Sequence, residues 1–295
     1  MEGFTFFLLI AAICILTVAK IIAQRTTARL YTRTPIDTVR MIALFFFFTS
    51  LAFLPMLVLS PPSSAAILYA IPAAILNLSF QVFYTLALSR GPAGLTVLFS
   101  NLSMLIPLLG ATFFLGEGFG LFRILGLVLT FAALVLNTDF RKGGNGLSRS
   151  WVSAMVLTFL SNGLATFWQK VFARSRVGTE VAAYGFFSYF IAAILAAILL
   201  LCLGRKKELR PSAPVSRGLV GGCALVGLFL GGFQWLFTYS QRVLEASLLL
   251  PIYNGATTVL MTLIGILFFK ETLTKRRLAA TVVGVAAIAL FSIVQ

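Results

Sequence analysis

The sequence predicts an all-α integral membrane protein of ten transmembrane helices, arranged as two five-helix inverted repeats. Three observations predict this class. Hydrophobic residues make up 60% of the 295-residue chain and charged residues only 11%, whereas soluble domains carry about 25% charge. Apolar runs near the ~20 residues that cross a bilayer recur along the whole length, and residues 80–136 are repeated at 233–290. The strands of a β-barrel would give short alternating segments instead.

The first helix is expected at 4–23 and the second at 35–59. The first run follows the acidic Glu2 and lacks a small-residue cleavage site, so it is a retained helix and not a signal peptide. Pro35 suits the first turn of the second helix, and Asp37 follows it in that turn.

The next three helices are separated by turn residues. The segment 60–64, with two prolines, precedes a helix at 65–88. Arg90–Gly91–Pro92 then precedes a helix at 93–115, in which Pro107 predicts a kink. A turn at 116–120 leads into a fifth helix that ends near 138.

The second half predicts five more helices after the glycine-rich polar segment 139–150. They are expected at 151–173, 179–203, 218–241, 246–269 and 274–294. Glycines spaced four residues apart in the third of these helices, as in the pairs Gly218/Gly222 and Gly227/Gly231, predict close helix packing.

Polar residues carry the internal repeat, because matches of Leu and Ala occur by chance in so apolar a chain. We expect a first repeat over residues 1–142 and a second over 143–295. The matched polar pairs are Gln81 and Gln234, Thr85 and Thr238, Asn101 and Asn254, and, after a one-residue slip, Glu117 and Glu271, and Arg123 and Arg277.

The cations of the chain predict its orientation. An odd number of helices per repeat makes the two halves enter the membrane from opposite sides, as in many secondary transporters. Alternate connections carry roughly 17 Lys and Arg residues on one face against 4 on the other, so the positive-inside rule places both termini outside the cytoplasm. The net charge of +15 is thus a membrane-topology signal, and no nucleic-acid partner is expected.

Composition also excludes classes of function. Histidine is absent, and the three cysteines lie in apolar runs without metal-ligand spacing, so neither a metal nor a disulfide is expected. The eight acids lie nearly all at helix ends, which argues against an enzyme. No phosphate-binding loop of the G-x-x-x-x-G-K-S/T kind occurs, so no cofactor or ATP is expected. The expected partners are the lipid bilayer and a small solute, and the chain is either a monomer or a homodimer.

Four amides are the main candidates for binding a solute: Gln81, Asn101, Gln234 and Asn254. An amide inside a bilayer is costly without a partner, so it either joins helices or lines a polar cavity. Both interpretations stay open. Because a pseudo-twofold axis would bring duplicated residues together where the repeats meet, we expect a solute site there.

Lys20 and Lys170 match when the first helices of the two halves are superposed. Each lies near the far end of its helix, so each either snorkels to an interface or flanks the cavity. Two such cations would favour an anionic or carboxylate-bearing solute. Tyr84, Trp168 and Tyr253, close in sequence to these amides and lysines, are candidates for stacking on it.

Glu117 and Glu271 each lie in a turn just before a helix, where an anion gains about 0.3–1 kcal/mol from the helix dipole. A structural role in these turns is expected. The alternative is a gating ion pair with Arg123 and Arg277, six residues further on in each case.

The string Phe113–Glu117, followed by Arg123, and the string Phe268–Thr274, followed by Gly284, resemble those of the EamA type of the drug/metabolite transporter superfamily. Arg40 resembles an arginine common near the start of the second helix in that family. The resemblance covers essentially the whole chain and implies the ten-helix transporter fold. Its motifs are diffuse, so they imply a fold and no particular substrate.

Two features depart from the family. Its ten-helix members usually have both termini in the cytoplasm, opposite to the orientation that the charges predict here. The small multidrug exporters of the superfamily carry an acid in their first helix, and here neither 4–23 nor 151–173 contains one. This weakens the interpretation as an exporter of cationic drugs.

The function expected from these observations is secondary transport. We expect the chain to export a small metabolite, such as an amino acid or another carboxylate-bearing solute, across a bacterial cytoplasmic membrane by alternating access. The alternatives are a flippase for lipids or lipid-linked sugars with the same fold and, less favoured, an integral membrane enzyme.

Overall fold

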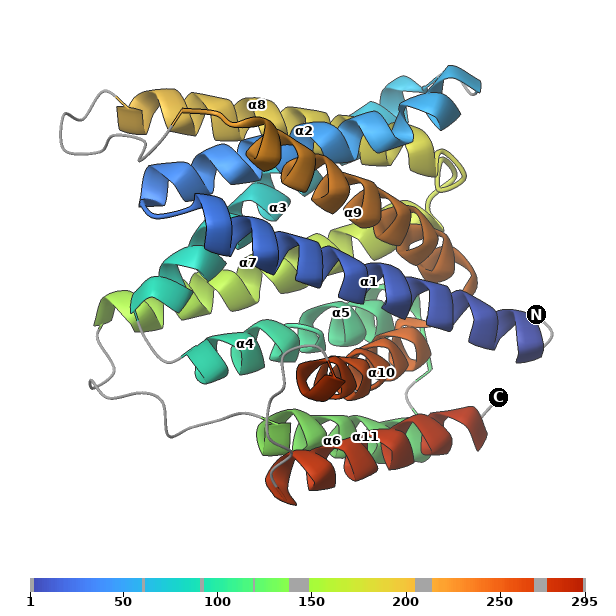
Figure 1. The fold of residues 1–295 in the computed structure, drawn as a ribbon. Coiled ribbons are helices and arrows are strands. Elements are labelled where there is room, and N and C mark those ends of the chain that lie inside the picture. The colour runs from blue at the N-terminus through green and yellow to red at the C-terminus, as the bar shows by residue number, and fades with distance from the viewer. Residues whose placement is uncertain are drawn as a thin grey trace. The chain divides into compact units, whose positions relative to one another are not determined.

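The computed structural model describes residues 3–59, 62–90, 93–118, 120–137, 149–204, 214–267 and 275–293. These residues form helices and no strand, which confirms the predicted all-α class (Figure 1). In chain order the helices are α1 (Gly3–Tyr31), α2 (Pro35–Leu59), α3 (Ser64–Arg90), α4 (Ala93–Leu102), α5 (Leu105–Leu115), α6 (Leu121–Asn137), α7 (Arg149–Arg174), α8 (Val181–Gly204), α9 (Arg217–Val243), α10 (Ala246–Leu267) and α11 (Lys275–Ile293).

Seven stretches in the described part of the chain are long and apolar enough to cross a membrane. They are α1, α2, α3, α7, α8 and α9, together with 95–115, which covers α4 and α5. α6, α10 and α11 contribute shorter apolar segments. The protein is therefore an integral, multi-pass membrane protein.

Most of the predicted helix bounds agree with the structure to within a few residues, and α2 has the predicted bounds. Two predictions were wrong. α1 continues to Tyr31, eight residues beyond the expected end, because the segment after 23 contains Gln24, Ala28, Leu30 and two arginines, which all favour helix although the segment as a whole is not apolar. The single helix expected at 93–115 is interrupted at Ser103–Met104.

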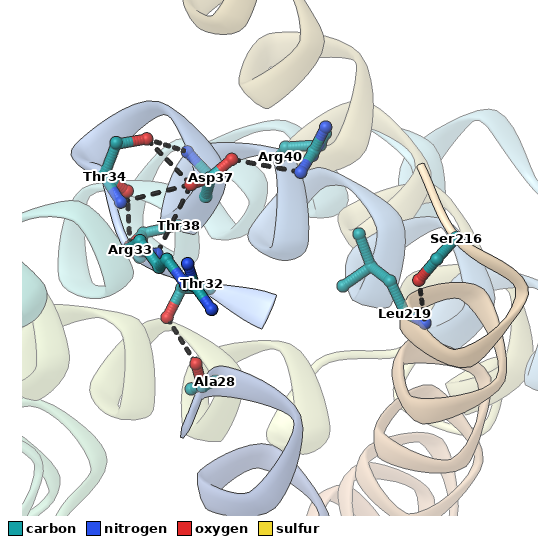
Figure 2. Close-up of polar contacts among 9 residues, drawn as sticks. All are labelled: Ala28, Thr32, Arg33, Thr34, Asp37, Thr38, Arg40, Ser216 and Leu219. Atoms are coloured by element: carbon teal, nitrogen blue, oxygen red, sulfur yellow. Dashed lines mark hydrogen bonds and ion pairs between the residues drawn. The ribbon is translucent and has the colours of Figure 1, made fainter. Parts of the chain in front are cut away.

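The start of α2 is a capping box (Figure 2). The backbone N–H of Asp37 donates to Thr34 Oγ1 at 3.3 Å, and Asp37 Oδ2 accepts from the backbone N–H of Thr34 at 3.1 Å. Pro35 occupies the first helical position, where a missing N–H costs nothing. Arg40, one turn on, donates from Nη2 to Asp37 Oδ1 at 3.0 Å. The arginine noted in the sequence thus stabilises this helix start.

One compact unit comprises residues 1–78 and 172–239 and contains α1, α2, α8 and most of α3 and α9. Within it α2 and α8 lie side by side (Figure 1), with Phe46 and Tyr189 in contact in the core. The glycines of α9 allow close packing, as predicted. A Cβ at Gly227 would lie 2.6 Å from the Phe48 Cβ of α2.

The other compact unit comprises residues 79–171 and 240–295. α6 and α11 lie side by side in it (Figure 1), and α10 packs on both and on α5. α7 contacts both α4 and α5, because Trp151 Nε1 donates to Thr96 Oγ1 at 3.1 Å and Gly110 packs against the ring of Phe167. Each unit draws on both halves of the chain, so these units are not the repeats 1–142 and 143–295, which stay a prediction.

Candidate functional site

The break between α4 and α5 has a local cause in the sequence. Proline has no N–H, and its ring clashes with the carbonyl group four residues before it. For Pro107 that residue is Ser103, the first residue of the interruption. The backbone turns there, with Met104 N–H donating to Asn101 O at 3.2 Å. The predicted kink is thus a two-residue interruption of an apolar helix, bridged by the hydrogen bonds from Met104 N–H to Asn101 O and from Ile106 N–H to Ser103 O.

Asn162 of α7 forms a polar cluster with Ser100 and Ser103 at the break. Asn162 donates from Nδ2 to the carbonyl of Ser100 at 3.0 Å and to Ser103 Oγ at 2.7 Å. Ser103 Oγ itself donates to the Ser100 carbonyl at 2.6 Å. These contacts satisfy backbone and hydroxyl groups that the interruption would otherwise leave unpaired.

Asn254 of α10 approaches the same break. Its Nδ2 lies 3.1 Å from Met104 Sδ and donates to the carbonyl of Leu250 at 2.9 Å. A backbone carbonyl only accepts, so this bond fixes which end of the amide is nitrogen, and the bond to Ser100 does the same for Asn162. Neither Oδ1 has a protein donor among the described residues. Asn162 and Asn254, which are half-buried, therefore offer two amide oxygens to a hydrogen-bond donor beside the buried residues Ser103 and Met104.

Glu117 and Lys170 form a buried ion pair in the same unit. Lys170 Nζ lies 2.6 Å from Glu117 Oε1, and their side chains are 1% and 5% exposed, respectively. Gly116 at φ 67°, a left-handed value that suits glycine, ends α5 and directs the chain into this turn. Lys170 is thus enclosed by protein instead of snorkelling to an interface.

Each charge of the pair also meets the end of a helix. Lys170 Nζ donates to the carbonyls of Gln241 at 2.9 Å and Leu244 at 2.6 Å, at the C-terminal end of α9. Glu117 Oε2 accepts from the backbone N–H of Ala246, the first residue of α10, at 2.5 Å. The positive group therefore faces the negative end of one helix, and the negative group faces the positive end of the next.

Glu117 was expected to stabilise the start of the helix that follows it in sequence, which is α6. It accepts a hydrogen bond instead from the N-terminus of α10. Its partner is Lys170, for which the sequence allowed a place at an interface or beside the solute. Glu271 lies outside the described residues, as do the side chains of Arg123 and Arg277. The proposed pairings with these arginines stay predictions.

The remaining candidates divide between the two units. Lys20, half-buried in α1, and Gln234, which donates to Tyr189 Oη, belong to the first unit. The second unit holds Gln81, which is buried, with Tyr84, Trp168 and Tyr253, which are half-buried. The bond from Gln234 joins α9 to α8, which is the helix-joining role. Solute binding by these residues stays a prediction.

Sequence reasoning missed Asn162, Ser100 and Ser103. Amides were chosen because they are duplicated in the repeat. Asn162 has no such duplicate, since Ala12 takes its place in the first half when Lys20 is superposed on Lys170. A signal was nevertheless present, because an amide in an apolar helix is costly with or without a duplicate.

Comparisons with known proteins agree with this architecture. The model of the EamA-like transporter family matches residues 149–293. A solved structure, described only as the crystal structure of a protein, has a TM-score of 0.76 and 18% sequence identity over 97% of this chain and 96% of its own. At that identity it supports the fold alone. No curated protein matches the chain.

Proposed function

We propose that this chain, which belongs to the EamA-like transporter family of the drug/metabolite transporter superfamily, is a secondary transporter that exports a small metabolite by alternating access. The family is one of membrane transporters, and the apolar helices agree with it. What we propose beyond the family is the class of solute, the direction of transport and the alternating-access cycle. The observation that carries the site is the break between α4 and α5.

The break has the properties of a solute site. Discontinuous helices form the substrate sites of many secondary transporters, because an interruption exposes backbone and side-chain polar groups at membrane depth. Here the groups available to a solute are the Oδ1 atoms of Asn162 and Asn254, which accept hydrogen bonds. A solute that donates hydrogen bonds, such as an amino acid through its ammonium group, fits them. Asn101, whose carbonyl closes the turn, belongs to the same site.

We further propose that the chain crosses the membrane ten times, in two inverted five-helix repeats, with α4 and α5 together forming one interrupted transmembrane span. Helices that hold the same place in the two halves pack together within a unit, as α2 does with α8 and α6 with α11. This pairing supports the repeat. The proposed location is a bacterial cytoplasmic membrane with both termini outside the cytoplasm, and Gln81, Gln234, Lys20 and the three aromatic candidates are kept as further solute contacts.

A thermal-shift screen of the purified protein tests the proposed function. The panel comprises amino acids, organic acids, sugars, polyamines, drugs and lipids. A solute at about a hundred times its dissociation constant should stabilise the folded state by roughly 2.7 kcal/mol. We expect an amino acid or a related carboxylate-bearing metabolite to do so, and Asn254→Leu to abolish the shift.

Gly221→Ala is the matched control, because a Cβ at Gly221 would meet nothing within 4 Å. This variant should keep the full response. Stabilisation only by lipids or lipid-linked sugars would replace the metabolite exporter with a flippase. An unchanged response in Asn254→Leu would remove the break from the site.

A further inference from the structure

Lys170 occupies a site built for a cation. Three oxygens surround its Nζ: the Oε1 of Glu117 at 2.6 Å and the backbone carbonyls of Gln241 and Leu244 at 2.9 and 2.6 Å. An ammonium group has three N–H donors and no acceptor, so three oxygens match it. In transporters, carbonyls at helix C-terminal ends together with a carboxylate are the groups that hold coupling cations.

We propose that these oxygens form a monovalent-cation site of the transport cycle, that the protonated side chain of Lys170 is the cation occupying it, and that the proton it exchanges is the coupling ion. This inference rests on the proposed function, because only a secondary transporter needs a coupling ion. Lysine can perform this exchange, since unlike arginine it gives up its proton in proteins.

The chemical step is the loss or gain of one proton. When one N–H bond of the Lys170 ammonium breaks, the proton passes to Glu117 Oε1, 2.6 Å away, which releases it in turn to water outside the site, and the electron pair stays on nitrogen. The neutral amine no longer neutralises Glu117 or the C-terminal end of α9. Because Glu117 also holds the first N–H of α10 at 2.5 Å, the change in charge acts directly on the connection between α9 and α10. α10 carries Asn254 of the solute site, so protonation and solute binding involve one helix.

A second buried group at the site supports an exchange of partners. The side chain of Gln241 is buried, and neither its Nε2 nor its Oε1 has a hydrogen-bond partner among the described residues. A buried amide left in this state is unusual and calls for an explanation. A neutral amine at Lys170 would accept a hydrogen bond, and Gln241, whose carbonyl it already contacts, brings a donor.

Other charged groups near the site are few in the described part of the chain. Ser247 Oγ lies 3.4 Å from the carbonyl of Gly118 and 3.5 Å from Glu245 Oε2, so Ser247 connects a second carboxylate to the residue that follows Glu117. Arg174 on α7 and Arg242 on α9 are exposed to their surroundings. Lys170 is thus the buried cation of this group, and its ion pair is with Glu117.

Chemical rescue of Lys170→Ala tests the cation site without knowledge of the solute. This variant removes the tethered cation and leaves the oxygens in place. Methylammonium chloride should raise its melting temperature by at least about 3 °C, whereas tetramethylammonium chloride at equal ionic strength should not, because it has no N–H to donate. The wild type should respond to neither salt. Equal effects of the two salts, or none from methylammonium, would overturn the site.

The double variant Lys170→Met with Glu117→Gln covers the case in which Lys170→Ala does not fold. Its pair is neutral and of similar volume, so it should fold and should show no methylammonium response. A methylammonium response in this variant equal to that expected for Lys170→Ala would contradict the inference, because its cation-binding charge is gone.

Proton movement in vesicles tests the coupling role. Protein is reconstituted with a pH-sensitive dye inside and exposed to a mixture of the twenty amino acids. We expect the solute to drive proton movement in the wild type, and expect Lys170→Met/Glu117→Gln to lose it while exchange of labelled amino acids continues. Proton movement that persists in this variant refutes the role of Lys170. Absence of both movements in the wild type is instead a failure of the proposed function.

Discussion

At the scale of single residues, burial of Glu117 and Lys170 is tolerated because each charge has hydrogen-bond partners beyond the other. A buried pair without further hydrogen bonds gains little over apolar side chains, since removing two charges from water is costly. Here the ammonium also binds two carbonyls and the carboxylate binds an N–H. The stability of the ion pair therefore depends on which residue carries which charge, as well as on the attraction between the two opposite charges.

Exchange of the two charges tests this dependence. The double variant Glu117→Lys with Lys170→Glu keeps an ion pair but turns an ammonium toward the N-terminus of α10 and a carboxylate toward the carbonyls of α9. We expect the exchange to lower the free energy of unfolding by about 3–5 kcal/mol, which is the usual cost of a single variant that leaves one buried charge unpaired. Thermal unfolding in detergent measures the effect.

The neutral double variant Glu117→Gln with Lys170→Met should be markedly more stable than the exchanged pair. Recovery of wild-type stability by the exchanged pair would show that attraction between the two charges suffices and that the helix ends contribute nothing.

At the scale of helices, α9 depends on glycine where it approaches α2. A Cβ at Gly227 would lie 2.6 Å from the Phe48 Cβ and 2.7 Å from the backbone nitrogen of Thr49. Neither atom belongs to a flexible side-chain tip, so the two backbones would have to separate. Such close approach is the usual reason for small residues between membrane helices.

Gly227→Ala should therefore destabilise the protein by about 1–3 kcal/mol, the usual cost of overpacking. Gly221, on the same helix, has open space on the side where a Cβ would lie, with nothing within 4 Å. Gly221→Ala should be neutral or stabilising by up to about 1 kcal/mol, because alanine favours helix over glycine. Melting temperatures of the two variants compare them directly, and equal losses in both would contradict the packing argument.

The sequence predicted helices better than it predicted contacts between them. The length of each apolar run sets a span, so the bounds of α2 followed from Pro35, Asp37 and the proline pair after Leu59. Whether Pro107 would bend or break its helix depended on Asn162 from another helix, which supplies partners at the break. Lys170 and Glu117 are far apart in sequence, and no local pattern joins them.

At the scale of the whole molecule, the two compact units do not follow the order of the chain. The first unit takes one segment from each half, whereas the second takes a segment that crosses from the first half into the second and another from the end of the second half. The boundaries between units fall inside α3, α7 and α9, at residues 78/79, 171/172 and 239/240. A sequence repeat is defined by the similarity of two segments of the chain, and a compact unit is defined by the segments that pack together, so the two need not agree.

A reporter fused after Gln295 tests the orientation of the molecule. The excess of Lys and Arg in alternate connections predicts that this end lies outside the cytoplasm. The matched control is the same reporter inserted at Glu208, within a connection that contains Arg205, Lys206 and Lys207, which should give the cytoplasmic signal. A cytoplasmic signal from the fusion at Gln295 would reverse the proposed topology.

The division of the chain also affects how the protein is made. α2 leaves the ribosome early, but the helix that covers it, α8, is complete only at Gly204. At roughly 5–20 residues per second, the delay is on the order of 10 s. For that time the core face of α2, including Phe46, meets lipid or the insertion machinery instead of its partner. Assembly of the first unit is therefore largely post-insertional, and a chain truncated before α8 should be a substrate for membrane quality control.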